Sequence, residues 1–475
     1  MHPVDLGIFI AYMLLMLAIG WYFHRRNKGH DDYFAGGRNM KSWHVGLSVV
    51  ATDVGGGFSI GLGGLGYMIG LSGSWILFTG LLGAWMSAVF LIPVVHRTGA
   101  MNHLLSFPQW LKHGYNKQVA FLAGLISAIG YLGFTSSQLL AGAKLASGVF
   151  TELELSSALL IMGGIAVVYT ALGGLKAVIY TDTVQWIILL GGLLFVGVPL
   201  GYHAIGGWEG IQASVPAHFL QLNNIGVIDL INWGVTIIPI WFIGMTLYQR
   251  IYALPDVRSA KKAWFIAGIF EYPVMAFLGV TLGLFSKIAA EQGLLAGVIG
   301  PDHSQLDAEM GLPVFLRTIL PVGGMGLLLS AYFSAILSTA DSCLVAASGN
   351  MIHDLLPDRK PFNSLGFGQL LTGLTGMIAI VLALQMTSVL DLMLYSYAFM
   401  VGGLFIPVIG LLVFSKPNPK AALWGMITGG VVTTAGAAPG VPIPWQLDPV
   451  IPGILASSML FLSIQKFGKQ AYGIS

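Results

Sequence analysis

The sequence predicts an all-α integral membrane protein with about 13 transmembrane helices, folded as a single transmembrane domain over residues 1–475. Of the 475 residues, 56% are hydrophobic, 9% are charged and 64 are glycine. A soluble domain carries about 25% charged residues and about 7% glycine, so this chain has too few polar side chains to cover a water-exposed surface. Apolar runs of about 18 or more residues recur along the chain, and each is long enough to cross about 30 Å of hydrocarbon as a helix. The composition therefore excludes a soluble enzyme, a nucleic-acid-binding protein and a disordered scaffold.

Charged residues and turn residues divide the apolar runs into thirteen expected helices. The first run is a retained helix and not a cleaved leader, because Asp5 stands at its start and Arg25 and Arg26 follow it. The expected spans are residues 5–23, 42–70, 74–95, 118–150, 156–173, 177–202, 230–253, 263–287, 317–352, 366–386, 389–414, 419–438 and 448–465.

The positions of the lysines and arginines support these spans, because cytoplasmic loops of membrane proteins collect basic residues. With the N-terminus outside, 19 of the 22 basic residues fall on the cytoplasmic side. Lys287 and Arg317 fall outside, and Lys144 stands near the outer end of its helix, where its long side chain is expected to reach the interface. The sequence thus predicts a multi-pass protein of a plasma or bacterial inner membrane with a cytoplasmic C-terminus. The cytoplasmic group is Arg25, Arg26, Lys28, Arg38, Lys41, Arg97, Lys112, Lys117, Lys176, Arg250, Arg258, Lys261, Lys262, Arg359, Lys360, Lys416, Lys420, Lys466 and Lys469.

The chain offers little that resembles an enzyme. Its extramembrane stretches are shorter than a soluble domain, which needs about 50 residues, and its histidines lie in loops or at helix ends. The single cysteine, Cys343, is expected to be a small buried core residue. We therefore expect a non-enzymatic function that is carried out inside the bilayer.

Four carboxylates within expected spans are candidates for function, because an unpaired charge in hydrocarbon costs several kcal/mol. They are Asp53, Asp182, Glu271 and Asp341. Glu271 has no polar residues around it in the sequence, so we interpret it as a helix cap or a hydroxyl-bonded group.

Asp53 lies in a segment, residues 51–58, that contains three consecutive glycines in the middle of a span. Glycine in a helix interior costs about 1 kcal/mol relative to alanine, so this triplet predicts a break in the helix. Unwound backbone within a membrane occurs where it lines a cavity or binds a ligand. Freed carbonyls can coordinate a cation, and freed amides can hold an anionic group. Close packing of small residues is the alternative explanation of the triplet.

A second polar cluster covers residues 334–342 and contains five side chains that carry oxygen. Ala335, Ser338, Thr339 and Ser342 share one helical face at the spacing i, i+3, i+4 and i+7. Hydroxyls, carbonyls and carboxylates are the ligands that hard cations prefer, so this face predicts a sodium site. A third segment, residues 170–185, has a glycine pair and Lys176 before a helix that places Asp182 about 9 Å further along its axis.

Together these three segments resemble the sodium:solute symporter family, which includes sodium-coupled carriers of proline, pantothenate, choline, sialic acid and sugars. Residues 31–38 and 416–430 resemble two further segments of that family. The resemblance implies a LeuT-type fold of two five-helix inverted repeats, here residues 42–202 and 230–414. One extra helix, 5–23, would precede them and two peripheral helices, 419–465, would follow. The second break would fall between Pro239 and Gly244.

The resemblance also implies site residues. The common sodium site maps to the carbonyls of Ala51, Val54 and Ala335 and to the hydroxyls of Ser338 and Thr339. A second sodium site, found in some members, maps to Asp182, Asp341 and Ser342, where Asp341 replaces a family serine. Two carboxylates in that dry site favour sharing a proton over binding an ion.

Solute contacts are expected from the two broken helices and from the helix that carries Phe134. The expected contact residues are Asp53, Gly55, Gly56, Gly57, Phe58, Phe134, Gln138, Trp241, Phe242 and Met245.

The overall prediction is a symporter that couples entry of the sodium ion to uptake of a small organic solute, with the lipid bilayer as its surroundings and no nucleic-acid partner. Proline or a similar amino acid is favoured because Asp53 matches an acidic position of proline carriers. The wording around Gly55 and Ser338 is closer to choline-like branches, so a choline-like amine or a carboxylate remains an alternative. A channel or a solute sensor on the same fold is a further one.

Overall fold

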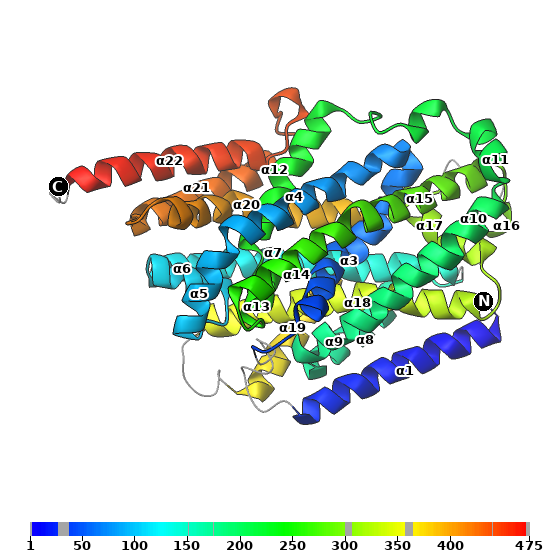
Figure 1. The fold of residues 1–475 in the computed structure, drawn as a ribbon, viewed down its shortest axis with the longest axis horizontal. Coiled ribbons are helices and arrows are strands. Elements are labelled where there is room, and N and C mark those ends of the chain that lie inside the picture. The colour runs from blue at the N-terminus through cyan, green and yellow to red at the C-terminus, as the bar shows by residue number, and fades with distance from the viewer. Residues whose placement is uncertain are drawn as a thin grey trace.

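The computed structural model describes residues 2–26, 38–150, 152–173, 175–299, 306–356, 364–438 and 440–471. Every regular element in these ranges is a helix, and the long helices form one bundle (Figure 1). The expected loop segment 31–37, the position of Gly174 and the side chain of Phe58 lie outside the described residues.

The first half of the chain begins with one helix that lies along the side of the bundle in Figure 1. Its helices are α1 (Pro3–Arg26), α3 (Ser42–Ile69), η1 (Gly70–Ser74), α4 (Trp75–Phe90), α5 (Ile92–Asn102), α6 (Phe107–Gly114), α7 (Lys117–Val149), α8 (Leu155–Gly173), α9 (Leu175–Gly192), η2 (Leu193–Gly197), α10 (Val198–Ala204), α11 (Gly207–Ser214) and η3 (Ala217–Leu220).

The second half begins with the helix pair α12 and α13. Its helices are α12 (Val227–Ile243), α13 (Met245–Tyr252), α14 (Val257–Ile269), η4 (Phe270–Met275), α15 (Ala276–Glu291), α16 (Ala296–Ile299), α17 (Ala308–Ile319), α18 (Gly324–Asn350), η6 (Met351–Leu355), α19 (Leu365–Ala383), α20 (Val389–Val413), α21 (Pro419–Gly436), η7 (Pro444–Gln446) and α22 (Val450–Ala471).

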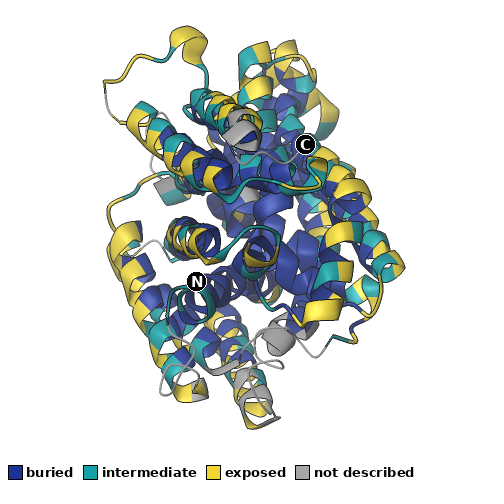
Figure 2. Cartoon of the chain, turned by 90° about the vertical axis from the view of Figure 1, so that its left-hand side faces the viewer, coloured by how far each residue is buried: buried dark blue, intermediate teal, exposed yellow. Residues whose placement is uncertain are grey.

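The exposed faces of the bundle carry large apolar side chains, as lipid contact requires. Phe195 and Met459 are 76% and 68% exposed. Buried residues gather inside the bundle and exposed ones on its outer faces (Figure 2). Seven spans in the described part of the chain are long and apolar enough to cross a membrane, or eight if the bent pair α12 and α13 is one span. The chain is therefore a multi-pass membrane protein.

Two expected spans differ from the observed helices in how the helices are divided. The span expected over 317–352 is wrong at its start, because α17 ends at Ile319 and α18 begins only at Gly324. Pro321 and the positive φ of 87° at Gly323 break the helix between them. The span expected over 74–95 continues through α5 to Asn102, and the amphipathic α6 was not expected at all.

The core of the bundle is α18, whose apolar stretch is entirely buried. Helices α7, α9 and α3 pack directly against it, and α1 covers another side. This arrangement brings the oxygen-rich face of residues 334–342 against the middle of α3, where the glycine triplet lies.

The N-terminal helix is fastened to the start of α18 through one side chain. Asp5 is buried, and its Oδ1 accepts hydrogen bonds from the backbone amides of Gly323 at 2.8 Å and Gly326 at 2.7 Å. Amides at a helix start lack partners within their own helix, so a carboxylate there stabilises the helix terminus. Helix α1 therefore packs on α18 through a specific polar contact as well as apolar surface.

Candidate functional site

The helix break expected in the glycine triplet is confirmed. Gly55 has φ 38° and ψ −155°, a conformation that interrupts α3 in the middle of the bundle. The glycines also allow close packing, since a Cβ on Gly56 would lie 2.7 Å from the side chain of Ala141. Both explanations of the triplet therefore hold: Gly55 supplies the backbone conformation and its neighbours supply the room.

The amides freed by the break are already bonded within the protein. Gln138 Oε1, on α7, accepts hydrogen bonds from Gly56 N at 2.7 Å and from Gly57 N at 3.2 Å. Gln138 stays a predicted solute contact, and in the structure its two hydrogen bonds hold the second half of α3 in place. The expectation that these two amides hold an anionic group of a ligand does not describe this arrangement.

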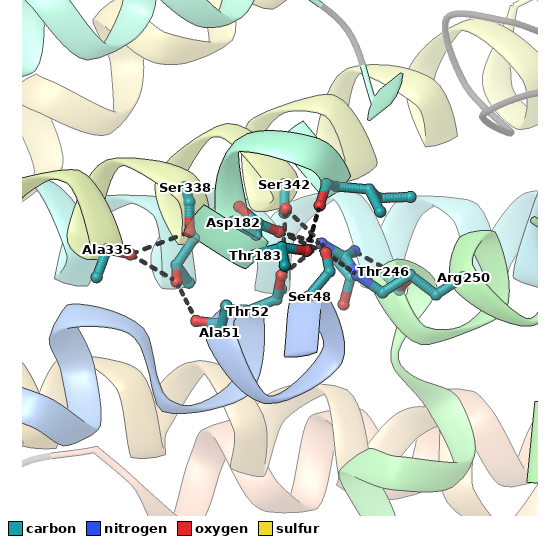
Figure 3. Close-up of polar contacts among 12 residues, drawn as sticks. Ser48, Ala51, Thr52, Asp182, Thr183, Thr246, Arg250, Ala335, Ser338 and Ser342 are labelled. Carbon is teal, nitrogen blue, oxygen red and sulfur yellow. Dashed lines mark hydrogen bonds and ion pairs between the residues drawn. The ribbon is translucent and has the colours of Figure 1, made fainter. Parts of the chain in front are cut away.

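Carbonyl and hydroxyl oxygens of α3 and α18 gather just before the break, on the left of Figure 3. Thr339 Oγ1 donates to Ala51 O at 2.8 Å and lies 3.3 Å from Ala335 O. Ser338 Oγ donates to Ala335 O at 3.2 Å. We call Ala51, Ala335, Ser338 and Thr339 the oxygen cluster. Val54, expected to add a carbonyl, is fully buried and lies directly before Gly55. Neutral oxygens from two helices within a few ångströms suit a hard monovalent cation.

An arginine lies beside the oxygen cluster at the centre of a second polar group (Figure 3). Arg250 Nη2 donates to Thr52 Oγ1 at 2.5 Å, to Ser342 Oγ at 2.9 Å and to Ser48 Oγ at 3.0 Å. The same nitrogen lies 3.5 Å from Asp182 Oδ2, and neither side chain is exposed. Ser48 also donates a short hydrogen bond to Asp182. We call Arg250, Asp182, Ser48, Thr52 and Ser342 the Arg250 cluster.

The Arg250 cluster includes two of the three residues assigned to a second sodium site. Asp182 and Ser342 both face the guanidinium group, whereas Asp341 accepts a short hydrogen bond from Thr170 of α8. The second oxygen of Asp341 has no hydrogen-bond partner among the described residues. A fixed cation therefore lies where the resemblance implied an ion.

The structure corrects the interpretation of Arg250 as a cytoplasmic loop residue, because it is fully buried on α13. The break before α13 is at Gly244, as expected, and bends the helix pair by 40°. A signal for Arg250 was present in the sequence, since it stands inside the expected span 230–253, where an unpaired cation is costly.

Beside the turn of α3 that precedes the break, a small cavity lies between α3, α7, α12, α13 and α20. Phe134 and Tyr397 meet edge to face with ring centroids 5.0 Å apart, and Tyr131 OH lies 3.0 Å from Thr246 Oγ1 across the second break. We call this space the aromatic cavity. It is lined by Thr52, Asp53, Tyr131, Phe134, Ile240, Gly244, Thr246, Leu247 and Tyr397.

Of the ten residues expected to contact the solute, Asp53 and Phe134 line the aromatic cavity. Trp241, Phe242 and Met245 serve packing in the described structure. The Trp241 ring fills a notch at Gly83, the Phe242 ring lies 6.1 Å from that of Phe405, and Met245 Sδ accepts from an amide of α6 at 3.3 Å.

Glu271 is neither a helix cap nor a hydroxyl-bonded group, which corrects its interpretation from sequence. It is fully buried, and neither carboxyl oxygen has a hydrogen-bond partner among the described residues. Its carboxyl group neighbours that of Asp53 and lies against Gly80 of α4, where any side chain would collide with it. This pairing could not be read from the sequence, because Glu271 lies 218 positions after Asp53.

Lys144, whose side chain was expected to reach the membrane interface, is buried and paired with carboxylates. It is 1% exposed, and its Nζ lies 2.5 Å from Asp307 Oδ2 and 2.6 Å from Glu309 Oε2. Glu309 accepts two further hydrogen bonds from the amides of Val389 and Leu390 at the start of α20, at 2.9 and 3.0 Å. We call Lys144, Asp307 and Glu309 the Lys144 cluster.

Comparison with known proteins places this geometry in context. The profile of the sodium:solute symporter family matches residues 33–429. The chain is 28% identical to the high-affinity proline transporter PutP of Bacillus subtilis (strain 168), over 94% of this chain and 95% of that protein. It is 26% identical to the sodium/proline symporter of Salmonella typhimurium, over 97% of this chain and 92% of that protein.

Solved structures agree at the level of the fold. A Na+-coupled sialic acid symporter in a substrate-bound, outward-open state matches with a TM-score of 0.80 at 19% identity, over 98% of each chain. The nucleobase-cation-symport-1 transporter MHP1 matches with a TM-score of 0.60 at 13% identity, over 94% of this chain and 97% of that one. Both are helical membrane transporters.

Proposed function

The chain belongs to the sodium:solute symporter family, and from this premise we propose that the solute it imports with sodium is proline or a similar small amino acid. As a member of this family it is a sodium-coupled symporter, with sodium as the coupling ion. The relatives named above are proline transporters and match over nearly the whole chain, which supports proline as the solute.

The oxygen cluster is the observation that carries the sodium site. The Thr339 hydroxyl on α18 donates a hydrogen bond of 2.8 Å to Ala51 O, in the last turn of α3 before its break. This contact brings the hydroxyls of α18 to the backbone carbonyls of α3. A sodium ion between these oxygens would replace the hydrogen bonds that the hydroxyls now make to carbonyls. Sodium would thereby fix the distance between α3 and α18, which gives the ion control over the conformation of the solute site.

The proposal includes the architecture that the sequence predicts. We propose thirteen spans, an external N-terminus and two repeats over residues 42–202 and 230–414. The two repeats account for the breaks at Gly55 and Gly244, because each break falls in the first helix of its repeat. Broken helices facing each other near the middle of the bundle are typical of transporters with inverted repeats.

One sodium per solute is the proposed stoichiometry. Arg250 places its positive charge beside Asp182, at 3.5 Å from Oδ2, and donates a hydrogen bond to Ser342, so a fixed cation already lies next to two of the residues that a second ion would need. Asp182 then balances the charge of Arg250, and in this proposal it also accepts sodium on its way out of the oxygen cluster.

The test is uptake of radiolabelled proline into proteoliposomes with and without an inward sodium gradient. We expect uptake to require sodium. The double variant Ser338→Ala with Thr339→Ala should raise the sodium concentration for half-maximal uptake by about tenfold or more, because two ligands of a cation are removed. Ser330→Ala is the control, since that hydroxyl donates within α18 to Gly326 O at 2.6 Å. Unchanged sodium dependence in the double variant would refute the proposed site.

A further inference from the structure

A cavity of about 1500 Å³ opens at the end of the bundle where α6 lies and α22 ends (Figure 1). Its walls come from the end of α5, from α6, from the start of α7, from η6 and from α21. The described lining shares no residue with the aromatic cavity, the oxygen cluster or the Arg250 cluster. We call this space the basic groove and define it by six of its lining residues, Lys112, His113, Lys117, Phe121, Leu423 and Ile427.

The polar side of the basic groove carries two lysines. Lys112 and His113 lie in the last turn of α6, and Lys117 begins α7. All three residues are exposed, and within the described part of the chain neither lysine forms an ion pair with a carboxylate. The short turn between α6 and α7 thus brings two ammonium groups to one groove, where they can bind an anion.

One carboxylate also borders the basic groove, but it is turned into the protein. Asp354 Oδ1 accepts a hydrogen bond from Ser106 Oγ at 2.9 Å, and the Asp354 side chain lies against Gly124 of α7, where a Cβ would come within 2.8 Å of it. Two lysines therefore face one aspartate in the described lining, and the groove favours an anion over a cation.

The other side of the basic groove is apolar and continuous with the lipid-facing surface. Phe121 follows Lys117 by one helical turn on α7 and is 51% exposed. Ile427 follows Leu423 by one turn on α21, and Trp424 between them is exposed, as is typical of tryptophan at a membrane–water interface. Charged side chains give way to lipid-facing apolar ones within about 6 Å along α7, because four residues rise by that distance. The same change occurs between the headgroups and the hydrocarbon of a bilayer.

We propose that the basic groove binds an anionic phospholipid. The lipid phosphate lies beside Lys112 and Lys117, and the acyl chains lie along α7 and α21 against Phe121 and Ile427. This ligand takes no part in the transport reaction, so the site does not depend on which solute the protein carries.

The two kinds of surface together favour a lipid over a soluble anion. Lysine is a compact charge on a flexible stem, which suits a phosphate group at a mobile interface. A soluble anion would use the lysines but would leave the apolar wall without a partner. In the proposed orientation this end of the bundle faces the cytoplasm, where basic pockets between transmembrane helices bind anionic headgroups.

The experiment compares three additives on the full-length protein in detergent at low, fixed salt. Dioleoylphosphatidylglycerol has the acyl chains and a negative headgroup, dioleoylphosphatidylcholine has the same chains and a zwitterionic headgroup, and inorganic phosphate has no chains. A ligand that binds the folded state raises the temperature of unfolding according to its affinity and concentration, so a thermal-shift titration measures each apparent affinity. We expect the phosphatidylglycerol to stabilise the protein clearly more than the phosphatidylcholine, and inorganic phosphate to have no effect.

A double variant then tests the two lysines. Each lysine beside an anionic headgroup contributes about fivefold to affinity, so Lys112→Gln with Lys117→Gln should weaken the binding of phosphatidylglycerol by about 25-fold. The matched control is Arg258→Gln with Lys262→Gln, which removes the same charge from two exposed residues of α14 that do not line the groove. We expect this control to keep the affinity of the unaltered protein.

Three results would overturn the lipid site. The first is equal stabilisation by the two lipids, which would mean that the headgroup charge is not recognised. The second is stabilisation by inorganic phosphate equal to that by phosphatidylglycerol, which would mean that a soluble anion occupies the groove. The third is an equal loss of affinity in the two double variants, or no loss in either, which would mean that the lipid responds to general surface charge or binds elsewhere.

Discussion

Two buried ionic clusters differ in how they balance a cation. In the Arg250 cluster, one carboxylate lies 3.5 Å away and neutral hydroxyls make the shorter contacts. In the Lys144 cluster, two carboxylates lie 2.5 and 2.6 Å from the ammonium group. The side chains of Arg250 and Asp182 are 0% exposed, whereas that of Asp307 is 43% exposed.

The difference reflects the helices that each cluster joins. The Arg250 cluster connects α3, α9, α13 and α18, which include both broken helices, and hydroxyls can exchange partners there without leaving a charge unpaired. The Lys144 cluster connects α7, the residues at the start of α17 and the start of α20. Its charges also contact water and backbone amides, so removing one partner leaves the others supported. Loss of the Arg250 cation should therefore destabilise the protein more than loss of the Lys144 cation.

The largest expected effect is that of Arg250→Met. The substitution leaves Asp182 buried without its cation and removes the donor to three hydroxyls, which should destabilise the protein by about 3–5 kcal/mol. Thermal unfolding in detergent measures the loss, and uptake in proteoliposomes should be abolished.

Arg250→Lys sharpens this result. A lysine keeps the charge but cannot supply the forked donors that reach Ser48, Thr52 and Ser342 together. We expect stability to recover more than uptake. Full recovery of uptake would show that charge alone, and not the hydrogen-bond geometry, accounts for the cluster.

A smaller effect is expected from Lys144→Met. Glu309 keeps its two backbone amide partners and Asp307 keeps its contact with water, so the loss should be about 1.5–3 kcal/mol. Combining Lys144→Met with Glu309→Gln in a double-mutant cycle isolates the pairwise interaction. If Lys144→Met destabilised the protein as much as Arg250→Met, the distinction between the two clusters would fail.

The smallest effect is expected from Asp307→Asn. The asparagine side-chain oxygen can still accept from Glu309 N, a hydrogen bond of 3.0 Å that caps α17. Only a half-exposed charge is removed, so the change in stability should be below about 1 kcal/mol and should shrink further in high salt. A larger loss that is insensitive to salt would mean that Asp307 is held more tightly than its exposure indicates.

The sequence predicts the helices of this fold well because each is a long apolar run, and runs do not depend on tertiary contacts. The expected ends of 42–70 and 389–414 lie within one residue of α3 and α20. The prediction failed where a short amphipathic helix or a turn within an apolar run decided the structure. The four residues between α17 and α18 are too few and too apolar to separate two helices by composition alone.

The candidate site was predictable where its residues are neighbours in the chain. The glycine triplet predicts a break at Gly55, and the helical face of Ser338 and Thr339 does meet the backbone of Ala51. Pairings between distant helices were not predictable, because one sequence does not show which helices touch. Arg250 with Asp182, Lys144 with Glu309 and Asp53 with Glu271 were all missed for this reason.

Because Asp5 contacts the start of α18, a label on the N-terminal helix can detect movement of α18. The hydrogen bonds to Gly323 and Gly326 tie α1 to the same helix that carries Ser338 and Thr339. Leu14 on α1 is 60% exposed, so a fluorophore or spin label placed there meets lipid and disturbs no packed surface. If α18 tilts when sodium binds, the signal of that label should change. The residues of the ion site stay unaltered in this measurement.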